Sequence, residues 1–122
     1  MPAVRSITVA IRNDSQQDVM IAYSQLTSGD WANGSPPVPG TVLGGEATIV
    51  VNEAHSAFTA LGGSMTLTPA SGGTVTVTWA WPRGMGVFGT ATGLSLYGLA
   101  LTSIVINGQT VNPQLQVYIT DS

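Results

Sequence analysis

The stretch MTLTPASGGTVTVTWAW, residues 65–81, determines the expected fold. Threonines alternate with Met65 and Leu67 before a Pro-Ala-Ser-Gly-Gly sequence, and with Val75 and Val77 after it. Successive side chains of a strand point to opposite faces, so this alternation predicts two strands, each with one face in a core and one in water. The proline and glycines between them predict a turn, and the stretch as a whole predicts a β-hairpin.

The same period of two recurs on both sides of this hairpin. Residues 6–12 and 19–24 alternate in the same way and are separated by a short Asn-Asp-Ser turn, so we expect them to pair as a second hairpin. Asn107-Gly108 is typical of a two-residue hairpin turn, with the next strand resuming at Gln109. Further strands are expected over residues 47–51, residues 94–106 with a bend at Gly98, and residues 115–119.

Three segments are too rich in Gly, Pro, Ser and Asn for regular structure. We expect loops over residues 27–45, 53–63 and 83–93. No window has helical periodicity, and turn signals recur at short spacing along the chain. These features predict an all-β fold, an antiparallel two-sheet β-sandwich of about eight or nine strands, with residues 1–122 forming one domain.

Composition narrows the function more than any motif does. The chain has three Arg, no Lys, six acidic residues and a net charge of −3, and only 7% of its residues are charged. A negative chain without Lys is a poor partner for nucleic acid. With no Cys and a single His, His55, there is little material for thiol, acid-base or metal chemistry. We therefore expect no enzyme activity, no catalytic residue, no metal site and no cofactor.

The N-terminus lacks the basic stretch, apolar run and small-residue cleavage site of a signal peptide. The longest weakly polar stretch, residues 94–106, is far shorter than the roughly 20 residues of a spanning helix. We expect synthesis in the cytoplasm without a signal peptide, followed by release or deposition.

Aromatic and apolar side chains in the loops are the best candidates for contact with a ligand. Trp79 shares a strand face with Val75 and Val77, which favours core packing, whereas Trp81 lies at the strand end beside Arg83. Trp31 is alone in a Gly- and Pro-rich segment and is expected either to close the end of the sandwich or to project outward. The candidate membrane or ligand contacts are Trp31, Trp81, Arg83, Met85, Phe88 and Tyr97.

Several short motifs fall in the order found in the aegerolysin superfamily. They are Ser6 to Asn13, Gly29-Asp30-Trp31, Gly63 to Pro69, and the later Gly72, Val75, Trp79, Pro82 and Gly84. The chain also resembles the small component of the binary insecticidal crystal toxins, through Gly29, Trp31, Ser35 and Pro36 and through Trp79, Pro82 and Gly84. The segment Trp-Ala-Trp-Pro-Arg-Gly, residues 79–84, departs from the Trp-Asp-Cys-Pro-Trp-Gly of aegerolysins, so the resemblance does not carry over a choice of lipid.

The resemblance implies a β-sandwich that binds a membrane lipid and, with a second, larger protein, contributes to pores in target cells, such as those of insects. We therefore predict a non-enzymatic, membrane-binding toxin component that acts at target-cell membranes. Two alternatives remain. One is a lectin-like carbohydrate-binding module in which Trp81, Trp31 and Tyr97 stack on sugars, and the other is a self-assembling homo-oligomer with edges such as residues 48–51 that lack Lys.

Overall fold

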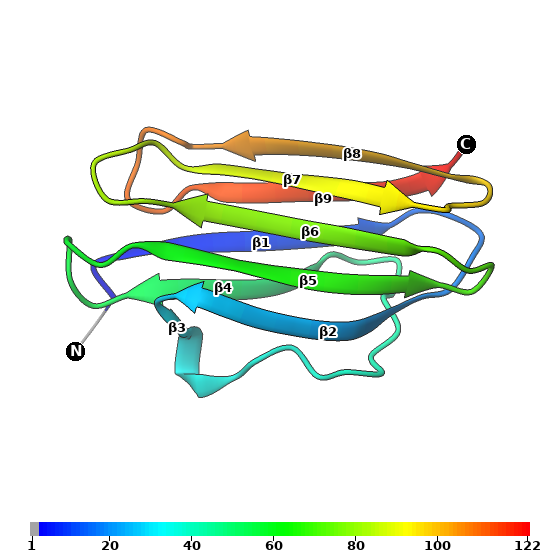
Figure 1. The fold of residues 1–122 in the computed structure, drawn as a ribbon, viewed down its shortest axis with the longest axis horizontal. Helices are drawn as coiled ribbons and strands as arrows, with labels where there is room; N and C mark the ends of the chain where they lie inside the picture. Colours follow the sequence, from blue (N-terminus) through cyan, green and yellow to red (C-terminus); the bar gives the residue numbers. More distant parts are fainter. Residues whose placement is uncertain (1–2) are drawn as a thin grey trace.

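A computed structural model describes residues 3–122 and consists almost entirely of β-strands in two stacked sheets (Figure 1). The five-stranded sheet has the order β3-β4-β1-β9-β8 and the four-stranded sheet the order β2-β5-β6-β7. The predicted two-sheet sandwich is confirmed. Its strands are β1 (Arg5–Asn13), β2 (Val19–Ser28), β3 (Asp30–Trp31), β4 (Thr48–Ala54), β5 (Leu61–Pro69), β6 (Thr74–Trp81), β7 (Phe88–Leu94), β8 (Leu99–Ile106) and β9 (Gln114–Asp121).

The core lies between the two sheets and follows the alternation in the sequence. In β6, Val75, Val77 and Trp79 are buried, and Trp79 is only 1% exposed, which confirms its predicted place in the core. The β5–β6 hairpin is also confirmed, since Leu67 pairs with Val75 and Met65 with Val77. In the part of the chain that the structure describes, no helix is long and apolar enough to cross a bilayer.

The expected hairpin of residues 6–12 and 19–24 is wrong. β1 lies in the five-stranded sheet between β4 and β9, whereas β2 pairs with β5 in the other sheet. Residues 14–18 cross between the sheets, and the Asn13 side chain fixes this crossing by accepting from Ser15 Oγ at 2.6 Å and donating to the Gln17 carbonyl at 2.8 Å. Alternation reveals which face of a strand is buried, but it does not reveal which strand lies beside it.

The two-residue turn at Asn107-Gly108 is also wrong. β8 and β9 do pair, with Ile106 opposite Gln114, but residues 107–113 connect them. Within this loop the Val111 carbonyl accepts from Ser6 N at 3.0 Å, and the Pro113 carbonyl accepts from Thr8 N at 3.1 Å. The segment after Asn107 therefore pairs with β1 instead of turning directly back along β8, and β9 continues parallel to β1.

The expected strand over residues 94–106 is shorter than predicted: Leu94 is the last residue of β7 in the other sheet, residues 95–98 connect the sheets, and the strand itself is β8 from Leu99. The expected loop over residues 83–93 is shorter than predicted, since residues 88–93 belong to β7. Similarly, β4 and β5 leave only residues 55–60 between them, and β2, β3 and a 3-10 helix (Ala32–Gly34) occupy residues up to 34 of the predicted loop 27–45. What remains of that loop covers the edge of β2, where Gly40 N donates to the Ile21 carbonyl at 2.7 Å and Leu43 N to the Val19 carbonyl at 2.8 Å.

Candidate functional site

One end of the sandwich gathers most of the predicted contact residues. β1 begins there at Arg5, and the loops 55–60, 82–87 and 107–113 lie at the same end (Figure 1). We call it the Arg5 end. The opposite end carries the connections 14–18, 70–73 and 95–98.

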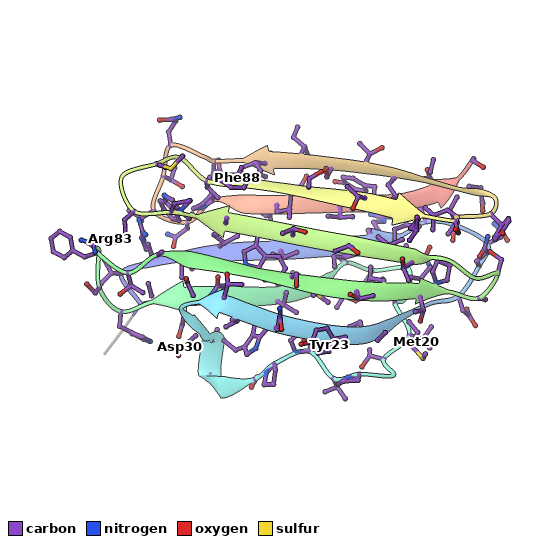
Figure 2. The ribbon with its side chains drawn as sticks, viewed as in Figure 1. Met20, Tyr23, Asp30, Arg83 and Phe88 are labelled. Carbon is purple, nitrogen blue, oxygen red and sulfur yellow. The ribbon has the colours of Figure 1, made fainter. Side chains whose placement is uncertain are left out.

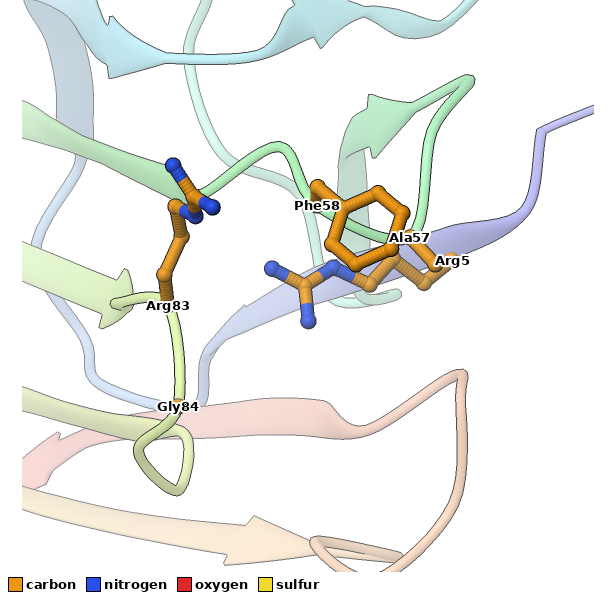
Figure 3. A pocket seen from close by; sticks show the side chains of 5 residues that line it. All are labelled: Arg5, Ala57, Phe58, Arg83 and Gly84. Carbon is orange, nitrogen blue, oxygen red and sulfur yellow. The ribbon is translucent and has the colours of Figure 1, made fainter.

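The Arg5 end contains an open pocket of about 660 Å³. Arg5 lines it from the start of β1, Ala57 and Phe58 from the β4–β5 loop, and Arg83 and Gly84 from the β6–β7 loop. Figure 3 shows Arg5 and Arg83 reaching the pocket from different sides, with the ring of Phe58 near Arg5. Three segments that are far apart in the sequence therefore build one site.

Arg5 enters the pocket because of its place in the alternation of β1. It is the first residue of β1 and lies two residues before the buried Ile7, so its side chain is on the inward-facing side of the strand. At this position the core ends and opens to the pocket. Trp81 holds the corresponding position in β6, after Val77 and Trp79. The Arg5 guanidinium carbon lies 4.2 Å from the centre of the Trp81 ring, which is a favourable cation–π contact between the two sheets.

The guanidinium of Arg5 is fixed but not fully hydrogen-bonded. Its Nη2 donates to the Thr59 carbonyl at 2.5 Å, while its Nε is buried and has no hydrogen-bond partner among residues 3–122. A buried donor without a partner costs roughly 1–3 kcal/mol. The sequence interpretation placed Trp81 beside Arg83, but the cation on the Trp81 ring is Arg5.

The charged side chains that line the pocket are of one sign. Within residues 3–122, no carboxylate forms an ion pair with Arg5 or Arg83, whereas Arg12 pairs with Asp14 at 2.8 Å. The acidic side chain of Glu53 lies 3.4 Å from His55 Nε2. An acidic protein thus presents two unpaired cations in one pocket.

Three large apolar side chains at the Arg5 end project into solvent. Phe58 is 74% exposed, Met85 62% and Phe88 55%. Phe58 belongs to the pocket lining, Met85 follows Gly84 in the same loop, and Phe88 begins β7 on the outer face of its sheet, at the same end as Arg83 (Figure 2). Large apolar groups kept out of the core in this way are typical of contact surfaces.

Trp31 packs against the core of the sandwich. It is half-buried against the core, and its ring meets that of Trp79 edge to face with centroids 6.2 Å apart. Asn52 fixes the neighbouring backbone, because its Nδ2 donates to the carbonyls of Ser28 and Asp30. Of the two predicted positions for Trp31, the structure has the one that closes the sandwich.

The six predicted contact residues therefore do not form one cluster. Arg83, Met85 and Phe88 are exposed at the Arg5 end, whereas Trp81 is half-buried beneath Arg5. Tyr97 is exposed in the connection 95–98 at the opposite end.

Two residues that complete the pocket, Arg5 and Phe58, are absent from the sequence-based set. The position of Arg5, two residues before an alternating apolar run, is the signal that was available for it. Nothing comparable marks Phe58, which lies in a loop.

A second, smaller hollow of about 180 Å³ lies on the outer face of the five-stranded sheet. Gln114, Gln116 and Tyr118 of β9 line it together with Arg12 and Ile49. The Tyr118 hydroxyl donates to Gln116 Oε1 at 3.1 Å, and Gln116 Nε2 donates to Gln114 Oε1 at 3.0 Å.

Among residues 3–122, no group of three or more His, Asp or Glu side chains is arranged to hold a metal ion.

Comparison with known proteins identifies the fold of this chain through solved structures. No protein-family model and no curated protein matches the sequence. Solved structures do match. RahU, determined in complex with Tris, has a TM-score of 0.72 at 15% identity over 99% of this chain and 98% of its own.

Two further structures share the architecture. The lipid-binding protein Nakanori has a TM-score of 0.72 at 10% identity over 94% of this chain and 70% of its own. The lectin XCL from Xerocomus chrysenteron has a TM-score of 0.62 at 10% identity over 94% of this chain and 97% of its own, in a variant with three methionine substitutions. At identities of 10–15%, these structures show that the chain shares their fold.

Proposed function

We propose that this protein is a non-enzymatic, membrane-lipid-binding protein that contacts the bilayer with its Arg5 end. One observation carries the proposal: a pocket that holds two unpaired arginines and the exposed Phe58 lies at the same end of the sandwich as two further exposed apolar side chains, Met85 and Phe88. Aromatic side chains favour the interface between headgroups and acyl chains, and arginine reaches from there to headgroup oxygens.

The comparison with Nakanori supports the proposal at the level of the fold, since that protein is a lipid-binding protein on the same sandwich. The composition also supports it. Only 7% of all residues in the chain are charged, so its surface is weakly hydrated, which lowers the cost of placing it against a membrane.

Co-sedimentation with lipid vesicles tests the proposal. The double variant Phe58→Ser, Met85→Ser removes two apolar groups at the Arg5 end, and we expect it to bind vesicles at least about tenfold more weakly than the unchanged protein. The matched control is Leu94→Ser, which removes a side chain that is 71% exposed at the opposite end and is expected to change binding less than about twofold. No binding to vesicles of any composition would overturn the proposal.

We further propose, on the strength of the aegerolysin resemblance, that the protein is the smaller component of a two-protein pore-forming toxin. The exposed end would then dock on the target membrane, and a larger partner would supply the pore. Dye release from vesicles of insect midgut lipid should be slow with this protein alone and rapid once the partner is added. Release by this protein alone at the same rate would overturn the division of roles.

Carbohydrate binding is the second candidate. The lectin XCL shares the fold, and the hollow on the outer face of the five-stranded sheet combines the Tyr118 ring with the amides of Gln114 and Gln116. Sugars are bound by such pairs of a ring face and amide groups. A glycan array with the unchanged protein and with Tyr118→Ala separates this function from lipid binding, because Tyr118 lies outside the Arg5 pocket.

A further inference from the structure

The lining of the Arg5 pocket is chemically one-sided. It consists of two guanidinium groups, one phenyl ring, one methyl group and the backbone of Gly84, and it contains no carboxylate. The nearby Glu53 carboxylate is within ion-pair distance of His55. A ligand in this pocket therefore meets hydrogen-bond donors from two cations and no acidic acceptor.

Arg5 is held ready to donate. Its contact with Trp81 and its hydrogen bond to the Thr59 carbonyl fix the guanidinium plane, while Nε remains buried without a partner. Because Nε is enclosed by the protein, a ligand in the pocket is met by the terminal nitrogens of the guanidinium groups. A fixed planar guanidinium favours acceptors with two or more oxygens at one centre, because it can donate to them in parallel.

We propose that the pocket binds the phosphate group of a phospholipid whose headgroup carries net negative charge. This inference rests on the membrane-binding function proposed above and specifies the class of lipid. Phosphate oxygens suit both arginines. A zwitterionic headgroup would also bring an ammonium group, for which the lining offers no carboxylate, so a lipid such as phosphatidic acid is bound in preference to phosphatidylcholine.

The charge of the whole chain opposes this selectivity. At a net charge of −3, the protein as a whole is repelled by an anionic membrane, so attraction must come from a local site. Binding by two arginines should weaken as salt is raised, but much less steeply than for a protein with a broad basic surface.

Trp81 provides the signal for a direct test, because its ring is in contact with Arg5. Vesicles of phosphatidylcholine alone and vesicles with a quarter of phosphatidic acid are titrated into the protein while tryptophan fluorescence is followed. We expect roughly tenfold tighter binding to the anionic vesicles, since the phosphomonoester of phosphatidic acid has one more free oxygen than the phosphodiester of phosphatidylcholine, and one charge-assisted hydrogen bond contributes about that factor.

Arg83→Gln should abolish most of this preference, with roughly tenfold weaker binding to anionic vesicles and little change for phosphatidylcholine. Arg12→Gln is the matched control, since it removes the same charge from the opposite end of β1, where Arg12 pairs with Asp14. It should change binding less than about twofold. Inorganic phosphate is titrated in parallel to separate a free anion from a lipid headgroup.

Each outcome bears on the proposal. Preference for anionic vesicles that is lost in Arg83→Gln but kept in Arg12→Gln supports it. Equal binding to both vesicle types overturns the phosphate site and leaves membrane binding intact, whereas no binding to either overturns both. If inorganic phosphate changes the fluorescence and anionic vesicles do not, the pocket takes a free anion and the lipid assignment is wrong.

Discussion

Asn52 and Arg5 are both polar side chains at inward-facing positions of neighbouring strands, yet their surroundings differ. In the register of β1 with β4, Asn52 lies opposite Ile7, and Arg5 is the next inward position towards the end of the sandwich. Asn52 is completely buried and uses its whole hydrogen-bonding capacity. It donates to the Ser28 and Asp30 carbonyls, and it accepts from Gly62 N at 2.9 Å and Trp79 Nε1 at 3.1 Å.

Arg5 leaves a buried donor unused beside an open pocket. The difference separates two roles for a polar group in a β-sandwich. A side chain whose hydrogen bonds are all internal joins the strands, whereas a cation that lines an open pocket without a carboxylate partner is available to a ligand. The four predictions below test this separation at specific residues.

The largest effect is expected for Asn52→Leu. The change leaves two donors and two carbonyl acceptors without their partner, and each orphaned group costs about 1–3 kcal/mol, so we expect the free energy of unfolding to fall by about 4 kcal/mol. Urea denaturation followed by tryptophan fluorescence measures it. Gln109→Leu, an exposed polar-to-apolar change in the loop 107–113, should shift stability by less than about 0.5 kcal/mol. A loss below about 1 kcal/mol in Asn52→Leu would contradict the assigned role.

Two glycines give the next test, because both have a positive φ and differ only in their surroundings. Gly29 has a φ of +80° and Gly84 a φ of +72°. A Cβ on Gly29 would lie 2.5 Å from Leu61 Cδ2 and 2.7 Å from Asn52 Nδ2, whereas a Cβ on Gly84 would meet nothing within 4 Å.

Both Gly→Ala variants therefore incur the backbone strain of roughly 1 kcal/mol, and Gly29→Ala adds the displacement of packed side chains. We expect losses of about 3 kcal/mol for Gly29→Ala and about 1 kcal/mol for Gly84→Ala, measured by thermal or urea unfolding. Equal losses would mean that the region around Asn52 is no more tightly packed than the loop at the Arg5 end.

Arg5→Met should have a smaller effect on stability. Methionine keeps an apolar stem against Trp81, and the change removes both the hydrogen bond to Thr59 and the buried, unpartnered Nε. These contributions oppose each other, so the free energy of unfolding should change by less than about 1 kcal/mol. Denaturation measures stability, and vesicle titration of the same variant should show lost preference for anionic lipid. A loss of unfolding free energy as large as that of Asn52→Leu would show that Arg5 has a structural role like that of Asn52.

The sequence is sufficient to predict those features of the fold that depend on a single strand or hairpin. The alternation in residues 65–81 is enough to predict the β5–β6 hairpin and the burial of Trp79, and both are confirmed. Strand pairing is different, because β1 lies between β4 and β9, the latter more than 100 residues away and parallel to it. No local pattern carries that information.

The site is less predictable than the fold for the same reason. Arg5 and Trp81 meet only because β1 and β6 face each other across the core, and the exposed Phe58 reaches the pocket from a loop. Asn52 was not recognised because the predicted strand ended at Val51 and its alternation was assigned to Ala47, Ile49 and Val51. This face is wrong, since Ile49 is exposed and the inward face of β4 is Val50, Asn52 and Ala54. A polar residue in an apolar face is understood only when its partners are known, and one of them, Trp79, is 27 residues away.

The smallest effect is expected for Tyr97→Ala, which tests whether function is confined to one end. The Tyr97 side chain is exposed, and the local hydrogen bond from Gln17 Nε2 reaches its backbone carbonyl at 2.7 Å, so truncation preserves that bond. Stability should change by less than about 0.5 kcal/mol and vesicle binding by less than about twofold. Tyr97 and Phe58 are comparably exposed aromatic residues at opposite ends of the sandwich. Comparing Tyr97→Ala with Phe58→Ala in the same assay therefore shows whether the position of the ring, and not the loss of a ring as such, determines vesicle binding. Equal weakening by the two changes would show that the bilayer does not distinguish the ends, and the unpaired cations of the Arg5 pocket would then not mark the binding surface.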